Sequence, residues 1–206
     1  MPQVLKPEIR ARILSAGLEV FAAQGYLGAT MNAIAESAGL AAASLYRYYP
    51  SKAELFGAAI TPELAARFEQ LLVQRVHALA QQPASAAFEP RSSYGSEMLE
   101  FWLEHRLAVV VLLDRAQGSA YEQYGERFVA LLLKSTLEQI RSAGPDVKIT
   151  PSAKFVLTRI FESTRTTLAG ILAHSDNPRL LRDAIQAFWS YQIPGLYGFA
   201  RWVRNE

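Results

Sequence analysis

Residues 30–56, TMNAIAESAGLAAASLYRYYPSKAELF, decide the fold of this chain. Apolar side chains recur in this stretch at helical spacing in two short runs, and a glycine separates the runs. Thr30 can cap the first run, and Gly39 ends it. Ser51 and Glu54 then have the spacing of a capping box, so another helix begins there. Together with an apolar helical pattern that precedes them, these runs predict three short helices with a sharp turn between the second and the third, which is typical of a helix-turn-helix.

The second run predicts a helix with one buried and one outward side, which stops near Pro50. When Leu45 is taken as the inward direction, a turn of about 100° per residue places Ala42 and Tyr49 near it. The opposite side carries Ala43, Ser44, Tyr46 and Arg47. A solvated helix face would more often carry Glu, Lys and Gln, and residues 37–53 contain no acid. This outward side is therefore a candidate for insertion into the major groove of DNA.

The same stretch resembles the signature of the TetR (AcrR-type) family of transcriptional repressors. The positions in register with that signature are Thr30, Ile34, Ala35, Ala38, Gly39, Leu45, Tyr46, Tyr48, Ser51, Lys52 and Leu55. The chain departs from it where Ala41 replaces the usual cap serine, Ala43 the usual glycine and Ser44 the usual threonine. The expected DNA-binding residues are Thr30, Asn32, Ala42, Ala43, Ser44, Tyr46, Arg47, Tyr48 and Lys52.

Two of these contacts have a physical reason of their own. Lys52 begins a helix, where a cation is unfavourable for the helix dipole, so a phosphate contact explains it better. Arg47 points outward and suits a guanine edge or a phosphate, with plain solubility as the alternative. Ser44 keeps the hydroxyl of the usual threonine, whereas Ala42 and Ala43 can offer only apolar contact, for example to a thymine methyl.

The remaining contacts are implied by the resemblance. Tyr46 and Tyr48 would contact phosphates or bases, with simple packing on the surface as the alternative. Thr30 would add a phosphate contact to its structural role as a helix cap. Asn32 projects from the second helix, where some members of the family touch a base.

The composition excludes several classes of protein. The chain has 206 residues, of which 50% are hydrophobic and 19% charged, so one or two folded domains are expected. It has no cysteine, and its three histidines lie far apart in sequence, so we expect neither a metal site nor a cofactor. The net charge is +2, and the whole excess lies in residues 1–52. Neither a signal peptide nor a membrane span is visible, so we expect a soluble cytoplasmic protein without a membrane partner.

The rest of the chain also reads as helices, which predicts an all-α protein. A helix that begins at Ser51 should run towards Leu79, with a kink at Thr61-Pro62. We expect a helix-turn-helix DNA-binding domain at residues 1–52 and a helical bundle at residues 53–206. The resemblance implies that this bundle binds a small-molecule effector and forms a homodimer.

Two sets of residues in the last two helices could form the dimer interface. Small residues at helical spacing would permit close approach of two helices: Ser163, Thr167, Gly170 and Ala173. Apolar residues could supply the partner surface: Phe188, Trp189, Ile193, Leu196 and Phe199. The alternative is an ordinary intramolecular core.

Polar or aromatic residues embedded in apolar helices are the candidates for ligand contacts. They are Trp102, His105, Arg115, Tyr121, Tyr124, Phe161 and Arg165. The alternative is structural, with Trp102 and Phe161 in the core and Arg115 in an ion pair. Arg115 and Arg165 would suit an anionic effector, whereas aromatic residues beside an acid such as Glu162 would suit a cation. The sequence leaves the charge of the effector open.

The sequence contains no nucleophile elbow, dinucleotide fingerprint, phosphate-binding loop or zinc-protease motif, so we do not expect an enzyme. The leading hypothesis is a ligand-responsive repressor that binds a pseudo-palindromic operator in double-stranded DNA as a homodimer and is released by its effector. The alternative is a helical lipid or small-molecule carrier of the same fold without DNA binding. Tyr46, Arg47, Tyr48 and Lys52 argue against the carrier, because it would have no use for them.

Overall fold

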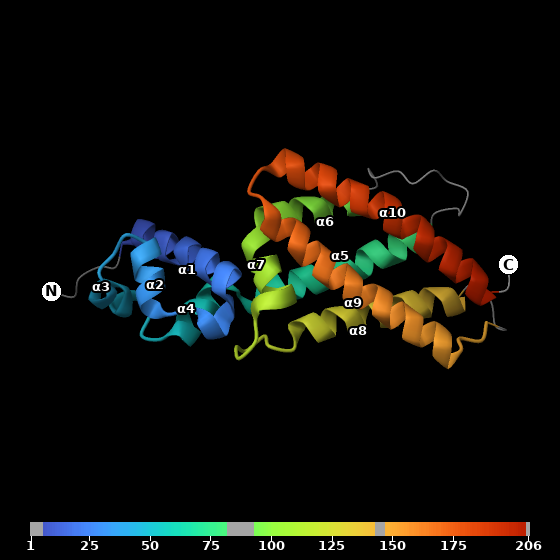
Figure 1. The fold of residues 1–206 in the computed structure, drawn as a ribbon, viewed down its shortest axis with the longest axis horizontal. Coiled ribbons are helices and arrows are strands. Elements are labelled where there is room, and N and C mark those ends of the chain that lie inside the picture. Colours follow the sequence, from blue (N-terminus) through green and yellow to red (C-terminus); the bar gives the residue numbers. More distant parts are fainter. Residues whose placement is uncertain (1–5, 82–92, 143–146, 205–206) are drawn as a thin grey trace. The chain divides into compact units, whose positions relative to one another are not determined.

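A computed structural model describes residues 6–81, 93–142 and 147–204 of the chain, and its regular elements there are all helices (Figure 1). The all-α prediction is therefore confirmed. In the described part of the chain, no helix is long and apolar enough to cross a membrane. The elements are α1 Pro7–Gly28, α2 Met31–Ser37, α3 Ala42–Tyr48, α4 Lys52–Ala59, α5 Pro62–Ala80, α6 Ser93–Glu104, α7 Arg106–Val110, the short π-helix η1 Val111–Arg115, α8 Tyr124–Ser142, α9 Pro151–His174 and α10 Pro178–Arg204.

The chain divides into two compact units. The first contains residues 1–66 and 107–124, and the second contains residues 67–106 and 125–206. Helices α1 to α4 and the π-helix η1 belong to the first unit, and α6, α8, α9 and α10 belong to the second. The boundary between the two compact units falls within α5. The predicted division at residue 52 separates the DNA-binding part of the chain from the rest, and it stays a prediction.

Helix α1 forms the centre of the first unit. Pro7 occupies its first turn, where a missing amide donor costs nothing. Its buried face consists of Ile13, Ala16, Gly17, Val20 and Phe21. A Cβ added at Gly17 would lie 2.6 Å from Leu55 Cδ2, so the glycine permits close contact with α4. Gly25 adopts a φ of 71° and breaks the regular helical path.

The prediction of a single kinked helix from Ser51 towards residue 79 is wrong, because two separate helices occupy this stretch. Ile60 adopts extended backbone angles, so α4 ends there and α5 begins anew at Pro62. Each helix has its own cap, because the Ser51 hydroxyl accepts a hydrogen bond from the amide of Glu54 at 3.2 Å and the Thr61 hydroxyl accepts one from Leu64 at 3.3 Å. A proline preceded by a capping threonine therefore starts a helix here rather than bending one.

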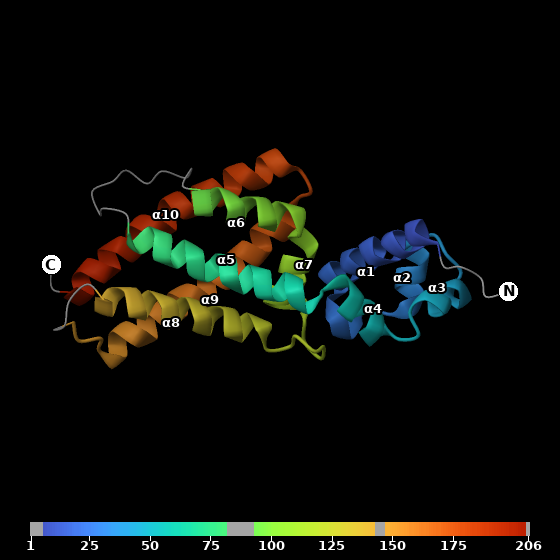
Figure 2. The same cartoon turned by 180° about the vertical axis from the view of Figure 1, so that it is seen from behind.

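The second unit is a bundle with two layers. Helices α9 and α10 lie on one side of it (Figure 1), and α5, α6 and α8 lie on the other (Figure 2). Phe68 of α5 is fully buried and packs against the rings of Phe101, Trp102 and Phe128, with centroid distances of 5.7, 6.5 and 5.7 Å. The side chain of Arg182 in α10 forms an ion pair with Glu100 in α6. Aromatic packing thus joins the helices of one layer, and this ion pair links the two layers.

Candidate DNA interface and ligand cavity

Helices α2 and α3 are the two helices of the predicted helix-turn-helix, and the turn lies between them. The Thr30 hydroxyl accepts a hydrogen bond from the amide of Ala33 at 3.1 Å and so caps α2. Gly39 follows α2 with a φ of 63°, and a Cβ added there would meet no atom within 4 Å. The turn therefore requires glycine for its left-handed backbone and not for lack of space. The amide of Leu40 donates to the carbonyl of Ala35 at 2.8 Å and closes the turn.

Helix α3 has the inward and outward sides that the sequence predicts. Leu45 is fully buried, and Tyr49 at the end of the helix is also buried. Tyr46 is 48% exposed, and Ala43 and Arg47 are exposed as well. The outward side therefore presents the phenol hydroxyl of Tyr46, the guanidinium of Arg47 and the small side chain of Ala43.

Tyr48, the last residue of α3, and Tyr49, its C-cap, hold the beginning of α1. The backbone amide of Lys6 donates to the Tyr48 hydroxyl oxygen at 3.2 Å. Arg10 Nε donates to the Tyr49 hydroxyl at 3.1 Å, and its guanidinium carbon lies 5.5 Å from the centroid of the Tyr49 ring. Tyr48 retains its O–H as a donor, because the bond from Lys6 uses only an oxygen lone pair. Sequence reasoning missed Arg10, which lies beside α3.

Lys52 has a structural role that the sequence did not reveal. Its ammonium donates to the carbonyls of Tyr26 at 2.6 Å and Ala29 at 2.8 Å, and it lies 4.5 Å from the centroid of the Tyr26 ring. A cation at the last carbonyls of a helix is favourable, so Lys52 caps the C-terminal end of α1. The unfavourable dipole at the start of α4 therefore no longer requires a phosphate to explain it, and the phosphate contact of Lys52 stays a prediction.

The other predicted DNA-binding residues lie at the N-cap of α2, on α2 and on α3. Thr30 and Asn32 are exposed at the start of α2, and Ala42 and Ser44 are half-buried in the first turn of α3. Ala41, the N-cap of α3, makes no side-chain capping bond, as expected for an alanine in place of serine. The structure thus places these residues on one short segment, and their DNA contacts stay predictions.

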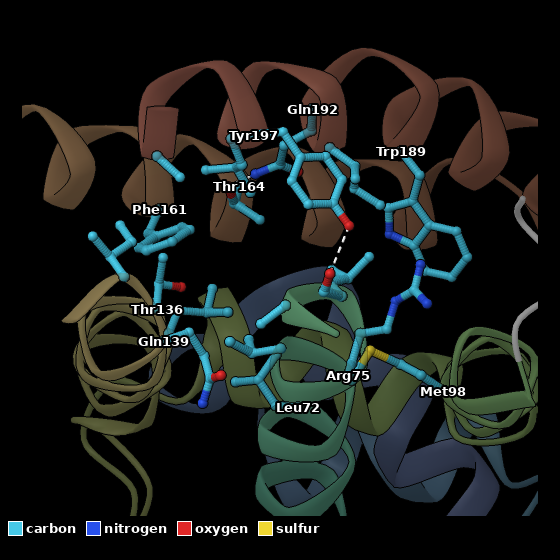
Figure 3. A pocket seen from close by; sticks show the side chains of 18 of the residues that line it. Leu72, Arg75, Met98, Thr136, Gln139, Phe161, Thr164, Trp189, Gln192 and Tyr197 are labelled. Carbon is cyan, nitrogen blue, oxygen red and sulfur yellow. Dashed lines mark hydrogen bonds between the residues drawn. The ribbon is translucent and has the colours of Figure 1, made fainter. Parts of the chain in front are cut away.

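The second unit contains a partly open cavity of about 540 Å³ (Figure 3). Trp102 and Phe161 line it, as predicted for ligand-binding residues. Most of the wall is apolar, with side chains from α5, α6, α8, α9 and α10. Within the described residues, no group of three or more His, Asp or Glu side chains could hold a metal ion.

Three of the other predicted ligand-binding residues belong to the first unit and do not line this cavity. Arg115 Nε lies 3.5 Å from the carboxylate of its neighbour Asp114. Tyr124 is buried, and its hydroxyl donates to the carbonyl of Ala65 at 3.0 Å. The ring of Tyr121 packs edge-on against Tyr124 at a centroid distance of 6.0 Å. These residues serve the packing of the first unit.

The remaining two, His105 and Arg165, belong to the second unit but are also absent from the cavity wall. The ring of His105 packs against Phe101 at a centroid distance of 4.8 Å, on the last turn of α6. Arg165 follows Thr164, which does line the cavity, so the helical step between neighbours turns its side chain away from the cavity. The structure therefore brings two of the seven predicted residues together at the cavity.

Arg75 is the main cavity residue that sequence reasoning missed. It is only 4% exposed, and its guanidinium carbon lies 5.1 Å from the centroid of the Trp189 ring. Burial lowers the pKa of Arg75, but a guanidinium remains protonated at neutral pH. The signal was in the sequence, because Leu72, Arg75, Val76 and Leu79 have the i, i+3, i+4, i+7 spacing of an apolar stripe, and all of them line the cavity.

Neutral polar groups from α9 and α10 complete the wall. The Tyr197 hydroxyl donates to the carbonyl of Leu79 at 2.7 Å, the bond drawn in Figure 3. Burial raises the pKa of Tyr197, and the charge of Arg75 opposes this increase. The side-chain amide of Gln192 donates to the hydroxyl of Thr164. The Tyr197 bond thus joins the two layers, whereas the bond between Gln192 and Thr164 joins α10 to α9 within one layer.

The small residues of α9 and the large apolar residues of α10, which were both predicted for the dimer interface, lie in different surroundings. Ser163, Thr167, Gly170 and Ala173 are all exposed on α9. By contrast, the predicted partner surface faces inward, since Phe188, Trp189, Ile193 and Leu196 line the cavity. The large apolar side chains left exposed on these helices include Phe155, Tyr191 and Trp202.

Comparison with known proteins agrees with the geometry. Residues 13–59 match the family described as "Bacterial regulatory proteins, tetR family". The chain is 45% identical over 56 residues to the HTH-type transcriptional repressors KstR of Mycolicibacterium smegmatis and Rhodococcus jostii. This match covers 27% of the chain and 28% and 26% of the two relatives, so the chain spans about a quarter of their length.

The fold likeness extends over the whole chain. The structure of a TetR-like transcriptional regulator from Rhodococcus sp. RHA1 aligns with 99% of this chain and 100% of its own, with a TM-score of 0.56 and 24% identity. The helix-turn-helix match and this shared all-helical architecture agree with the outward face of α3. Residues 13–59 of this chain are therefore similar to the tetR family of bacterial regulatory proteins, and the whole chain has the fold of a TetR-like regulator.

Proposed function

We propose that this protein is a ligand-responsive transcriptional regulator, which as a homodimer represses from a pseudo-palindromic operator and is released by a small molecule. The outward side of α3 is the observation that carries this proposal. Tyr46 and Arg47 are exposed on a helix whose opposite side is fixed by the fully buried Leu45. A rigid helix with an exposed, guanidinium-bearing face has the geometry needed to read base edges in a major groove.

The cavity supports the ligand-responsive part of the proposal. Its volume of about 540 Å³ lies within the range of small-molecule sites, and its wall is apolar with a few polar groups. Trp102, Phe161 and Arg75 line it from three different helices. A ligand that binds more tightly to one conformation than to another would shift the affinity for DNA by the same coupling free energy.

The alternative of a carrier without DNA binding is not favoured. A carrier would use the cavity of the second unit but would give no reason for an exposed Tyr46 and Arg47 on α3. The match to the family of bacterial regulatory proteins, over residues 13–59, also includes the helix-turn-helix and no residue of the cavity wall. We therefore expect a cytoplasmic DNA-binding regulator rather than a carrier or an enzyme.

The operator experiment tests the DNA face. We expect the full chain to shift the DNA upstream of its own gene, and Arg47→Ala to reduce specific affinity by about 1–3 kcal/mol while binding to random DNA changes little. Arg141→Ala, which removes an exposed arginine from α8, is the matched control and should bind like wild type. Equal losses on specific and random DNA would show that Arg47 contacts the backbone only, and no specific binding by wild type would contradict the proposal.

The dimer would form through the outer faces of α9 and α10. Tyr191 and Trp202 are 83% and 62% exposed there, and exposed apolar side chains of this size indicate an interaction surface. A symmetric dimer of this kind would bury on the order of 2,000 Å² in total. A Cβ added at Gly170 meets nothing within 4 Å, so Gly170→Arg is compatible with the folded monomer but not with close approach of a second copy.

Sedimentation of Gly170→Arg measures this directly. We expect a dimer for wild type and a monomer for the variant at micromolar concentration. Gly57→Arg on α4, where an added Cβ also meets nothing within 4 Å, is the matched control and should remain dimeric. A dimeric Gly170→Arg would move the interface away from α9, and a monomeric wild type would contradict the homodimer.

A further inference from the structure

The cavity of the second unit is long. Its lining residues recur along α10 from Phe188 to Arg204, a helical rise of about 24 Å, and along α8 from Phe128 to Ser142. A volume of about 540 Å³ distributed along these helices forms a channel rather than a round pocket. Its occupant is therefore an elongated molecule.

The charges of the wall have one sign. Among the described residues that line the cavity, Arg75 and Arg204 are basic, and none is Asp or Glu. Acids on the surrounding helices form ion pairs with other arginines: Glu69 with Arg127, Glu97 with Arg67, and Glu100 with Arg182. A cationic ligand would therefore enter a wall of its own sign, whereas an anion would meet the opposite sign in a medium of low polarity.

Nitrogen donors gather around one residue, Trp189. The guanidinium of Arg75 lies over its ring, and the ring of Trp102 packs against it at a centroid distance of 5.7 Å. Trp102 is 4% exposed, and its indole N–H has no hydrogen-bond partner among the described residues. A buried donor without an acceptor is unfavourable, so an acceptor brought by a ligand would stabilise it.

The opposite part of the wall lacks this character. In Figure 3, Arg75, Trp189 and Met98 lie on one side, and Phe161, Thr136 and Gln139 lie on the other. The latter group contributes an aromatic ring, a hydroxyl and an amide, all without charge. The channel thus has a donor-rich, cationic region at Arg75, and its second basic residue, Arg204, lies at the other end of the stretch of α10 that lines it.

We propose that this cavity binds an elongated amphipathic anion, with an anionic oxygen head group at Arg75 and Trp102 and an apolar body along α8 and α10. The proposal rests on the proposed function, because it names the chemical class of the effector. A guanidinium and an indole N–H together can hold a carboxylate or a phosphate oxygen by charge-assisted hydrogen bonds. The apolar wall would contribute by burying the body of the ligand.

Calorimetric titration of the full-length protein tests the head group with four probes that share one C12 chain and are kept below their micelle concentrations. They are dodecanoate, dodecyl phosphate, 1-dodecanol and dodecyltrimethylammonium. We expect the better of the two anions to bind about 10- to 100-fold more tightly than the alcohol, and the cation to bind most weakly. Which of the two anions binds more tightly identifies the head group. Equal affinities for the anions and the alcohol, tighter binding of the cation, or no binding of either anion would overturn the proposal.

Arg75→Met keeps most of the apolar stem and removes the charge. We expect it to abolish the preference for the anion over the alcohol, while the affinity for the alcohol changes less than about threefold. Arg67→Met, on the same helix but outside the cavity wall, is the matched control and should keep the preference. Circular dichroism establishes that each variant is folded. If Arg75→Met does not fold, Trp102→Phe supplies the decision, because it removes only the indole donor and should weaken anion binding about two- to tenfold.

The failure of this proposal is distinguishable from failure of the proposed function. Specific DNA binding without anion binding would retain the regulator and overturn the anionic class. Anion binding by a protein that does not bind its operator would support the cavity assignment and overturn the regulator. A folded Arg75→Met variant that still prefers the anion would place the head group elsewhere and so overturn the assignment.

Discussion

The candidate functional side chains are exposed on the surface of the first unit, whereas those of the second unit line a cavity. In the first unit, Tyr46 and Arg47 project outward from α3, while Leu45 behind them is fully buried. In the second unit, Arg75 and Trp102 line a cavity whose wall is mostly apolar. An outward functional group is conspicuous because it replaces the usual Glu and Lys of a solvated face. An inward one resembles the core residues beside it, so its position depends on the three-dimensional fold.

The difference predicts unequal responses to the same substitution, Leu→Ala. Leu45 is enclosed on all sides, so Leu45→Ala should reduce the free energy of unfolding by about 2–5 kcal/mol. Leu72 is also buried but lines the cavity, so its side chain has fewer neighbours to lose, and Leu72→Ala should cost about 1–2 kcal/mol.

Urea unfolding followed by far-UV circular dichroism measures both free energies. The comparison holds only if the two units unfold together, which coincident transitions for helicity and tryptophan fluorescence would establish. If Leu72→Ala destabilises the protein as much as Leu45→Ala, the cavity wall is as tightly packed as the core of the helix-turn-helix, and the contrast between the units fails.

Lys52 provides the second test, because it lies in the region that the sequence predicts well but does something the sequence did not show. Its ammonium donates to the carbonyls of Tyr26 and Ala29. Lys52→Ala removes these charge-assisted bonds and should lower the free energy of unfolding by about 1–3 kcal/mol. If capping is its whole role, the slope of log affinity for DNA against log salt stays unchanged.

A phosphate contact would give a different result. The slope would then become shallower by about one unit per half-site, because each phosphate neutralised by a lysine releases a counterion. The control for loss of a lysine charge is Lys148→Ala. Lys148 is exposed in the second unit and lies outside any helix. A shallower slope with unchanged stability would contradict the capping role.

The sequence predicts the fold of the first unit well because its signals are local. Thr30, Gly39 and Ser51 each mark a helix end by side-chain or backbone chemistry that acts within a few residues. The same local reasoning failed at Thr61-Pro62, because this pair of residues is compatible both with a kinked helix and with the start of a new one. The structure has a new helix, since Ile60 before the pair adopts extended backbone angles.

The cavity was harder to predict because periodicity identifies the apolar side of a helix but does not say whether that side meets a neighbour or a space. Of the predicted ligand-binding residues, Trp102 and Phe161 line the cavity, whereas Tyr124 has the same aromatic character and packs in the first unit. Likewise, Trp189 and Ile193 were assigned to a partner surface, and they line the cavity. Arg75 was the one strong signal overlooked, since a charge in an apolar stripe requires an explanation.

The smallest expected effect concerns Tyr197, at the cavity. Burial raises its folded-state pKa above the unfolded value of about 10, so the neutral hydroxyl contributes stability below that pH. This contribution is lost as the pH rises through the raised folded-state pKa, because the hydroxyl then no longer donates to the carbonyl of Leu79. The stability advantage of wild type over Tyr197→Phe should therefore shrink above about pH 10 and stay constant between about pH 7 and 9.

Urea unfolding of both proteins across this pH range isolates Tyr197, since the other tyrosines are common to both. The cavity adds a second readout, because a phenolate at Tyr197 would place a negative charge near Arg75. Binding of dodecanoate should then weaken above pH 10 in wild type but not in Tyr197→Phe, while binding of 1-dodecanol should be the same in both. A loss of dodecanoate affinity that is equal in the two proteins would assign the titration to another group and contradict the role of Tyr197 at the cavity.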